Sequence, residues 1–194
     1  MTILRRLKDY LDAQKVRYEI LTHQEAFTAP EIAQMLHVPG KEMAKVVMVK
    51  VGERFVMVVI PANSKVDLTR LKEIFREAPV RLATEDEFKG LFPDCQVGTM
   101  PPFGNLYGLE VYVDRSLTTD EEIVFQAGTH KEAVKLRYQD FANLVHPTVA
   151  EFHQSPTKLS GHLGCGHLAT HGGRHVPDRE PVTTCRCQSA GEGR

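Results

Sequence analysis

Residues 40–61 read GKEMAKVVMVKVGERFVMVVIP, and this stretch decides the fold. Two runs rich in Val and Met flank Gly52-Glu53. Branched side chains pack well on a pleated surface and glycine permits a tight turn, so the stretch predicts a β-hairpin of two largely buried strands. Lys45 stands at the foot of the first strand. Because burying an unpaired ammonium is costly, Lys45 must either reach water or face a cavity where its charge is used.

The segments around the hairpin carry capping residues and apolar periodicities typical of short helices and strands. Helices are predicted over residues 2–14 with Thr2 as N-cap, from Thr28 to residue 38, over 67–77 with Asp67 as N-cap, from Thr84 to about residue 89, and from Asp140 as N-cap. Further strands are predicted over residues 16–21, 80–82, 109–113, 122–126 and 133–138. Together they predict an α+β fold, with a mixed, mostly antiparallel sheet of six or seven strands surrounded by helices.

The bulk composition limits the classes of partner. The 194 residues are 42% hydrophobic and carry a net charge of -1, which suits one core and gives no overall basic surface for duplex DNA. No apolar run reaches the length of a membrane span, and the first residues alternate charged and apolar side chains, unlike a signal peptide. We therefore expect a cytoplasmic protein that binds neither a membrane nor duplex DNA.

Three separated blocks of sequence, taken in order, resemble one known family. The first runs from YEILTH (18–23) through FTAPEIA (27–33) to AKVVMVK (44–50), and the others are GTMPPFG (98–104) and FQAGTH (125–130). The ordered set is similar to the YbaK/ProX family of trans-editing aminoacyl-tRNA deacylases, relatives of the editing domain inserted in bacterial prolyl-tRNA synthetases. The resemblance covers roughly residues 1–154, which are therefore expected to form a single YbaK-like domain.

The resemblance implies hydrolysis, in trans, of the ester that joins a wrong small amino acid (Ala, Ser, Thr, Cys or Pro) to the 3'-terminal adenosine of a tRNA. It implies that Lys45 is the central functional residue and that Gly98 lies beside the scissile ester. An aminoacyl ester is already activated, so a glycine-rich loop and one ammonium can stabilise the developing charge without a metal, a cofactor or a nucleophilic side chain. Lys45 is then expected to bind and orient the substrate.

Further candidate residues surround this catalytic pair. The walls of a small, size-selective pocket are assigned to Phe27, Met48, Met100, Pro102 and Phe103. His130 is a polar group able to contact the ester, the amine or a substrate hydroxyl, and the same resemblance adds Thr28, Gly104 and Gly128 to the substrate-binding set. The expected partners are the acceptor end of an aminoacyl-tRNA and an aminoacyl-tRNA synthetase.

Other interpretations of the same residues stay open at this level. Lys45 could be a surface lysine that covers the end of the hairpin, the loop from Gly98 to Gly104 could be a rigid corner, and Met100 and Phe103 could fill the core. His130 could be structural. The chain could also be a non-catalytic module of the same fold that holds a tRNA end, a nucleotide or a synthetase.

Residues 155–194 differ in character from the rest of the chain. Gly, His, Arg, Pro and Thr dominate and apolar periodicity is lost, so this segment is predicted to be a disordered tail rich in His, Cys and Gly. Its Gly-Cys-Gly-His and Cys-Arg-Cys motifs lack the Cys-x-x-Cys spacing of structural zinc sites, so no metal site is expected.

Overall fold

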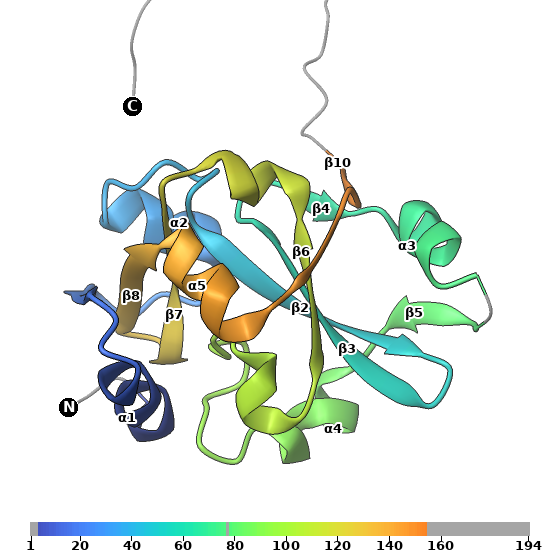
Figure 1. The fold of residues 1–194 in the computed structure, drawn as a ribbon, viewed down its shortest axis with the longest axis horizontal. Helices are drawn as coiled ribbons and strands as arrows, with labels where there is room; N and C mark the ends of the chain where they lie inside the picture. The colour runs from blue at the N-terminus through green and yellow to red at the C-terminus, as the bar shows by residue number, and fades with distance from the viewer. Residues whose placement is uncertain (1–3, 77, 155–194) are drawn as a thin grey trace, which may run out of the picture. The chain divides into compact units, whose positions relative to one another are not determined.

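The Val- and Met-rich hairpin is present as strands β2 (Ala44–Val51) and β3 (Arg54–Pro61) in the computed structural model, which describes residues 4–76 and 78–154. The register runs without a break from the Ala44–Pro61 pair to the Val51–Arg54 pair. Gly52 takes a φ of 59° in the turn, a left-handed conformation that glycine adopts without a steric penalty. The predicted hairpin is therefore confirmed (Figure 1).

The hairpin forms the middle of a five-stranded sheet with the order β5-β2-β3-β6-β9. Strand β5 (Val80–Leu82) pairs antiparallel with β2, whereas β3 with β6 and β6 with β9 pair in parallel. The remaining strands of this sheet are β6 (Glu110–Asp114) and β9 (Thr148–Ala150). The sheet is thus mixed, and it holds the start of β2, where Lys45 lies, next to the end of β3.

The other strands form two antiparallel sheets. A three-stranded sheet has the order β1-β8-β7, and a two-stranded sheet pairs β4 with β10. Their bounds are β1 (Tyr18–Thr22), β7 (Glu122–Thr129), β8 (Glu132–Arg137), β4 (Lys65–Val66) and β10 (His153–Gln154). The α+β class with a mixed sheet is confirmed. The strands are divided among sheets of five, three and two rather than gathered in one of six or seven, because the contact between Met43, which precedes β2, and Val124 of β7 is an isolated bridge and not a continuous ladder.

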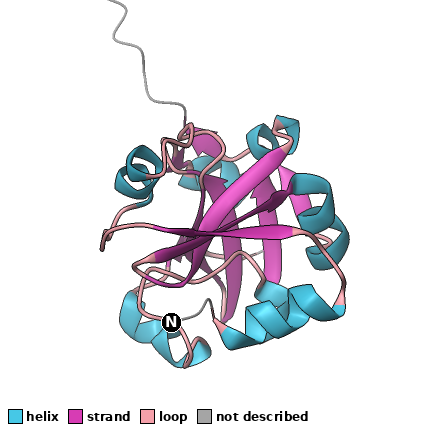
Figure 2. Cartoon of the chain, turned by 90° about the vertical axis from the view of Figure 1, so that its left-hand side faces the viewer, coloured by secondary structure: helices cyan, strands magenta, loops and turns pink. Residues whose placement is uncertain are grey.

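Short helices surround the strands (Figure 2). The α-helices are α1 (Arg5–Ala13), α2 (Ala29–Met35), α3 (Leu68–Ile74), α4 (Glu85–Phe88) and α5 (Tyr138–Val145), and the 3-10 helices are η1 (Lys89–Leu91), η2 (Gly104–Tyr107) and η3 (Arg115–Thr119). The caps Thr28 and Asp67 are found as predicted, since each side chain accepts a backbone N–H of its helix. Thr28 also forms a capping box with Glu31, which fixes the start of α2.

One predicted cap is wrong. Asp140 lies inside the first turn of α5, and the helix begins two residues earlier, at Tyr138. The reason is that β8 leads directly into the helix, where the backbone N–H of Tyr138 donates to the carbonyl of Glu121 and the Tyr138 side chain is buried. Thr2, the other predicted cap, lies outside the described residues, as does the predicted tail over residues 155–194.

Both faces of the hairpin are buried in separate parts of the core. Alternate residues such as Met48 and Met57 pack with Phe103, Phe125 and neighbouring apolar side chains. The residues of the opposite face pack with α3 and with Phe152. Because successive side chains of a strand point to opposite faces, the apolar runs of the hairpin serve both clusters. No helix in the described part of the chain is long and apolar enough to cross a membrane.

Candidate functional site

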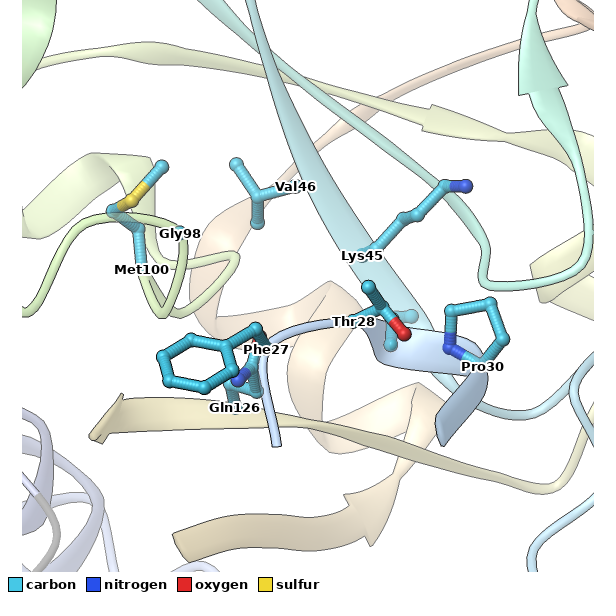
Figure 3. Close-up of a pocket in the computed structure, with 10 residues that line it drawn as sticks. Phe27, Thr28, Pro30, Lys45, Val46, Gly98, Met100 and Gln126 are labelled. Carbon is cyan, nitrogen blue, oxygen red and sulfur yellow. The ribbon is translucent and has the colours of Figure 1, made fainter. Parts of the chain in front are cut away.

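A cavity of about 240 Å³ lies where the start of β2 meets the N-terminus of α2, the loop after residue 97 and strand β7 (Figure 3). Its lining residues are Phe27, Thr28, Ala29, Pro30, Ala44, Lys45, Val46, Gly98, Met100 and Gln126. The cavity is smaller than most clefts that hold drug-sized ligands, so it suits a small group. Both predicted catalytic residues, Lys45 and Gly98, line it, together with three predicted substrate contacts, Phe27, Thr28 and Met100.

Lys45 is half-buried and is held by two backbone oxygens. Its Nζ donates hydrogen bonds to the carbonyl of Ala62 at 3.1 Å and to that of Ser64 at 2.7 Å. In Figure 3 its side chain extends away from Gly98. Burial lowers the pKa of Lys45 below its ordinary value of 10.5, and the nearby charge of Lys65 lowers it further. The lysine is therefore a fixed group in the cavity wall rather than a freely solvated side chain.

The loop at Gly98 is held in place by its neighbours. Thr99 donates to the carbonyl of Gln96 through both its backbone N–H and its hydroxyl, and its own carbonyl accepts the N–H of Gly128. Gly98 has a φ of 87°, and an added Cβ would meet no atom within 4 Å. Within the described part of the chain, the N–H groups of Gly98 and Met100 have no hydrogen-bond acceptor. Two unpaired backbone donors thus belong to residues that line the cavity.

Phe27 and His130 lie together at the edge of the cavity. Phe27 is 67% exposed, and its ring stacks on that of His130. The Nδ1 of His130 lies 3.2 Å from the carbonyl of Ala26, and its backbone N–H donates to the Gln96 side chain. His130 itself lines a neighbouring cavity of about 370 Å³. The structure therefore links His130 to the Lys45 cavity through Phe27 and does not include it in the lining.

The other predicted site residues lie away from this cavity. Met48, Pro102, Phe103 and Gly104 are buried. Phe103 packs against the rings of Tyr10, Phe125 and Phe141, and a Cβ on Gly104 would lie 2.6 Å from Val111. Gly128 forms part of the irregularity in β7 and packs against Leu4. Their positions fit structural roles, because the loop that brings Met100 to the cavity turns its next residues into the core.

Gln126 lines the cavity but is not among the site residues that the sequence predicts. It is only 8% exposed, and its Nε2 has no hydrogen-bond partner among the described residues. The available signal was one amide within an otherwise apolar strand, since the preceding residues are Ile123, Val124 and Phe125. Buried polar groups are almost always paired, so an unpaired one in a cavity wall points to a ligand.

The polar side chains around the cavity are those of Thr28, Lys45 and Gln126. None of them is a carboxylate or a histidine. In the described ranges, no three His, Cys, Asp or Glu side chains are arranged to hold a metal ion. The cavity thus presents an ammonium, an amide and free backbone N–H groups, a set that hydrogen-bonds and stabilises negative charge.

The chain is similar in sequence to part of the proline–tRNA ligases of two bacteria. The proline–tRNA ligase of Bacillus cytotoxicus is 26% identical over 106 residues, which cover 55% of this chain and 18% of that protein. The enzyme of the same name from Geobacillus sp. is 28% identical over 90 residues, covering 46% and 16%. The chain therefore spans less than a fifth of the length of these curated relatives.

Solved structures share the fold. The crystal structure of a candidate trans-editing enzyme for prolyl tRNA synthetase superposes with a TM-score of 0.68 at 20% identity, over 78% of this chain and 97% of that chain. A hypothetical protein superposes with a TM-score of 0.69 at 24% identity, over 77% and 99%. The sequence profile of the aminoacyl-tRNA editing domain matches residues 23–144, a range that contains every residue of the cavity. The chain belongs to the aminoacyl-tRNA editing domain family.

Proposed function

We propose that this protein is a trans-editing deacylase, which cleaves the ester of a mischarged aminoacyl-tRNA carrying a small amino acid: Ala, Ser, Thr, Cys or Pro. The observation that carries the proposal is the shared cavity of Lys45 and Gly98 within the editing domain. The likeness to proline–tRNA ligases and to a candidate trans-editing enzyme supports the same class of substrate. The acceptor end of the tRNA is the partner, and a synthetase that produces the mischarged tRNA is a further one.

For this reaction the protein needs mainly to orient the substrate and to stabilise the charge that develops on the ester. Water adds to the ester carbonyl carbon, the bond from that carbon to the ribose oxygen breaks, and the ribose oxygen leaves with a proton. Negative charge develops on the carbonyl oxygen, where the free N–H groups of Gly98 and Met100 are suitable donors. The Lys45 ammonium binds and orients the substrate from the opposite side of the cavity.

The volume of the cavity supports selection by size. Phe27 and Met100 stand in its wall, and a cavity of about 240 Å³ excludes large side chains sterically. Hydrophobic exclusion separates larger from smaller substrates well and small ones from each other poorly, because each methylene contributes only about 1–3 kcal/mol. A pocket of this kind suits an enzyme that removes small amino acids.

The proposal is tested by a deacylation panel of tRNAs charged with Ala, Ser, Thr, Cys and Pro. We expect hydrolysis of at least one ester by the wild type and its loss in Lys45→Ala. Lys50→Ala is the matched control, because Lys50 lies on the same strand but pairs with Glu53 and Glu87 outside the cavity. Equal activity in Lys45→Ala would remove Lys45 from its role, and loss of activity on adding a chelator would refute metal-free hydrolysis.

A second function is favoured by one specific feature. Among the residues that the structure describes, no carboxylate or histidine that could act as a general base lines the cavity, and the Lys45 ammonium already donates to two carbonyls. A non-catalytic module that holds a tRNA end or a synthetase would need no base. Intact esters across the whole panel, together with measurable binding of tRNA, would favour this module over the deacylase.

A further inference from the structure

The most buried part of the Lys45 cavity is apolar except for one amide. Ala44, Met100 and Gln126 are each less than a tenth exposed, whereas Phe27 is largely exposed at the mouth. The Nε2 of Gln126 is buried and has no hydrogen-bond partner among the described residues. Leaving a buried amide unpaired destabilises the free protein, so a ligand that pairs with it gains correspondingly in affinity.

The groups of a small aminoacyl ester differ in how they can form hydrogen bonds with the amide of Gln126. An ammonium only donates and a carbonyl only accepts, whereas a hydroxyl does both. The two ends of a glutamine amide have almost the same shape, and the side chain can present either its NH2 or its oxygen. A hydroxyl is therefore the one group that pairs with Gln126 in both orientations.

We propose that Gln126 reads a hydroxyl on the side chain of the aminoacyl group, so that the cavity takes seryl and threonyl esters in preference to alanyl and other unsubstituted ones. This inference rests on the proposed function for the identity of the ligand. Gln126 thereby becomes a specificity-determining residue. The flanking Ala44 and Met100 provide the apolar surface for the Cβ, and for the methyl group of a threonyl side chain.

The location of Gln126 separates this role from contact with the ribose or the ester. In the view of Figure 3, Gln126 lies away from the side-chain nitrogen of Lys45, the residue assigned to orienting the substrate. Groups common to all aminoacyl esters are expected between Lys45 and Gly98. The residue that distinguishes one amino acid from another is expected at the buried end, where Ala44, Met100 and Gln126 lie.

The inference is tested first on the wild type with stable analogues, in which the aminoacyl group is joined by an amide to 3'-amino-3'-deoxyadenosine. Seryl and 2-aminobutyryl analogues have the same size and differ in a hydroxyl against a methyl. We expect the seryl analogue to bind about tenfold more tightly by calorimetry, as one hydrogen bond to a buried partner provides. Equal affinities, or failure of every analogue to bind, would overturn the inference.

Substitution of Gln126 then assigns the preference to this residue. Gln126→Met keeps the length and shape of the side chain, and we expect it to remove the preference by weakening the seryl analogue alone. Gln34→Met, on the exposed part of α2, is the control expected to keep it. Equal weakening of both analogues would mean that Gln126 contacts a shared group, and a preference that survives Gln126→Met would mean that another residue reads the hydroxyl; either overturns the inference.

The proposed function can fail separately from this inference. Calorimetry with amide analogues measures recognition and needs no hydrolysis. A wild-type protein that prefers the seryl analogue but releases no amino acid from any charged tRNA would refute the deacylase and retain the role of Gln126. A 2'-deoxy form of the seryl analogue identifies the hydroxyl concerned: unchanged affinity supports the side-chain contact, and loss of the seryl preference in the 2'-deoxy form refutes it.

Discussion

The rings of Phe27 and His130 are in tilted contact, with their centroids 4.6 Å apart and their planes at 51°, and each ring belongs to a residue that lines a different cavity. One is the cavity of Lys45 and Gly98, which Phe27 lines, and the other is lined by His130. Because Phe27 is 67% exposed, the contact forms a wall at the surface rather than part of the core. The contact between Phe27 and His130 therefore joins the linings of the two cavities.

Removing this wall is expected to relax size selection. Phe27→Ala should lower the ratio of alanyl to leucyl ester hydrolysis by about tenfold or more, because the enlarged mouth no longer excludes the larger side chain. The free energy of unfolding should fall by less than about 1 kcal/mol, since the side chain is mostly exposed. Met35→Ala removes an exposed apolar side chain from α2, outside the cavity, and should keep the ratio. An unchanged ratio in Phe27→Ala would show that Phe27 does not limit the size of the aminoacyl group.

The charge of Lys65 should contribute to the alkaline limit of activity. Burial and Lys65 lower the pKa of Lys45 below 10.5, so a reaction that needs the Lys45 ammonium declines as pH rises through that lowered pKa. Lys65→Gln removes the like charge, raises the pKa of Lys45 and should move the decline to higher pH. Initial rates between about pH 6 and 10, corrected for spontaneous ester hydrolysis, measure this shift.

The control for this change is Lys72→Gln, which removes an exposed charge from α3 that does not act on Lys45. Its profile should match the wild type. A decline that stays at the same pH in Lys65→Gln would show that a group other than the Lys45 ammonium limits the rate.

Two glycines of one loop should respond differently to a methyl group. Gly98→Ala meets no atom but must keep a φ of 87°, so we expect a cost of about 1–2 kcal/mol in stability and a loss on the order of a hundredfold in kcat/KM from misplacing the loop. In Gly104→Ala the Cβ would lie 2.6 Å from Val111 Cγ2 and 2.9 Å from the Leu109 carbonyl. That variant should lose about 1–3 kcal/mol of stability while its folded fraction keeps near-normal kcat/KM. The reverse pattern would contradict the assignment of Gly98 to the site.

Asp114 should account for part of the acid sensitivity of the fold. This carboxylate is buried and accepts the backbone N–H groups of Phe152 and His153 through Oδ2 and both the N–H and hydroxyl of Ser116 through Oδ1. Burial opposes its charge, but these hydrogen bonds outweigh burial, so the pKa of Asp114 is lowered below 3.8. Its stabilising contribution is therefore complete above about pH 4 and is lost as pH falls through the lowered pKa.

Asp114→Asn replaces one acceptor by a donor that faces the Phe152 and His153 N–H groups or that of Ser116. We expect a loss of about 3 kcal/mol in the free energy of unfolding, measured by urea denaturation, and a weaker dependence of stability on acid pH. Asp86→Asn is the matched control, because the Asp86 side chain is 88% exposed, and it should change stability by less than about 0.5 kcal/mol. A loss of similar size in both variants would refute the special role of Asp114.

Local signals in the sequence predicted many of the elements but not how the sheets divide. The caps Thr28 and Asp67 and the turn at Gly52 depend on contacts within a few residues, and each occurs as predicted. Short strands such as β4 and β10 are not predicted, because a pair of two-residue strands has no periodicity of its own. The prediction of Asp140 as N-cap is wrong because Tyr138 is buried by tertiary contacts and α5 begins there.

The sequence by itself determined the hairpin, since a hairpin depends on side-chain type and near neighbours, and it determined the order of the three family blocks. The resemblance of those blocks made Lys45 and Gly98 candidate site residues. The tertiary structure alone decided which residues share the cavity. Met100 lines it, while Phe103, three residues later in the same loop, packs among core rings. Gln126 is identified as a site residue only from the tertiary structure. Whether a buried amide lacks a partner depends on the positions of all nearby donors and acceptors.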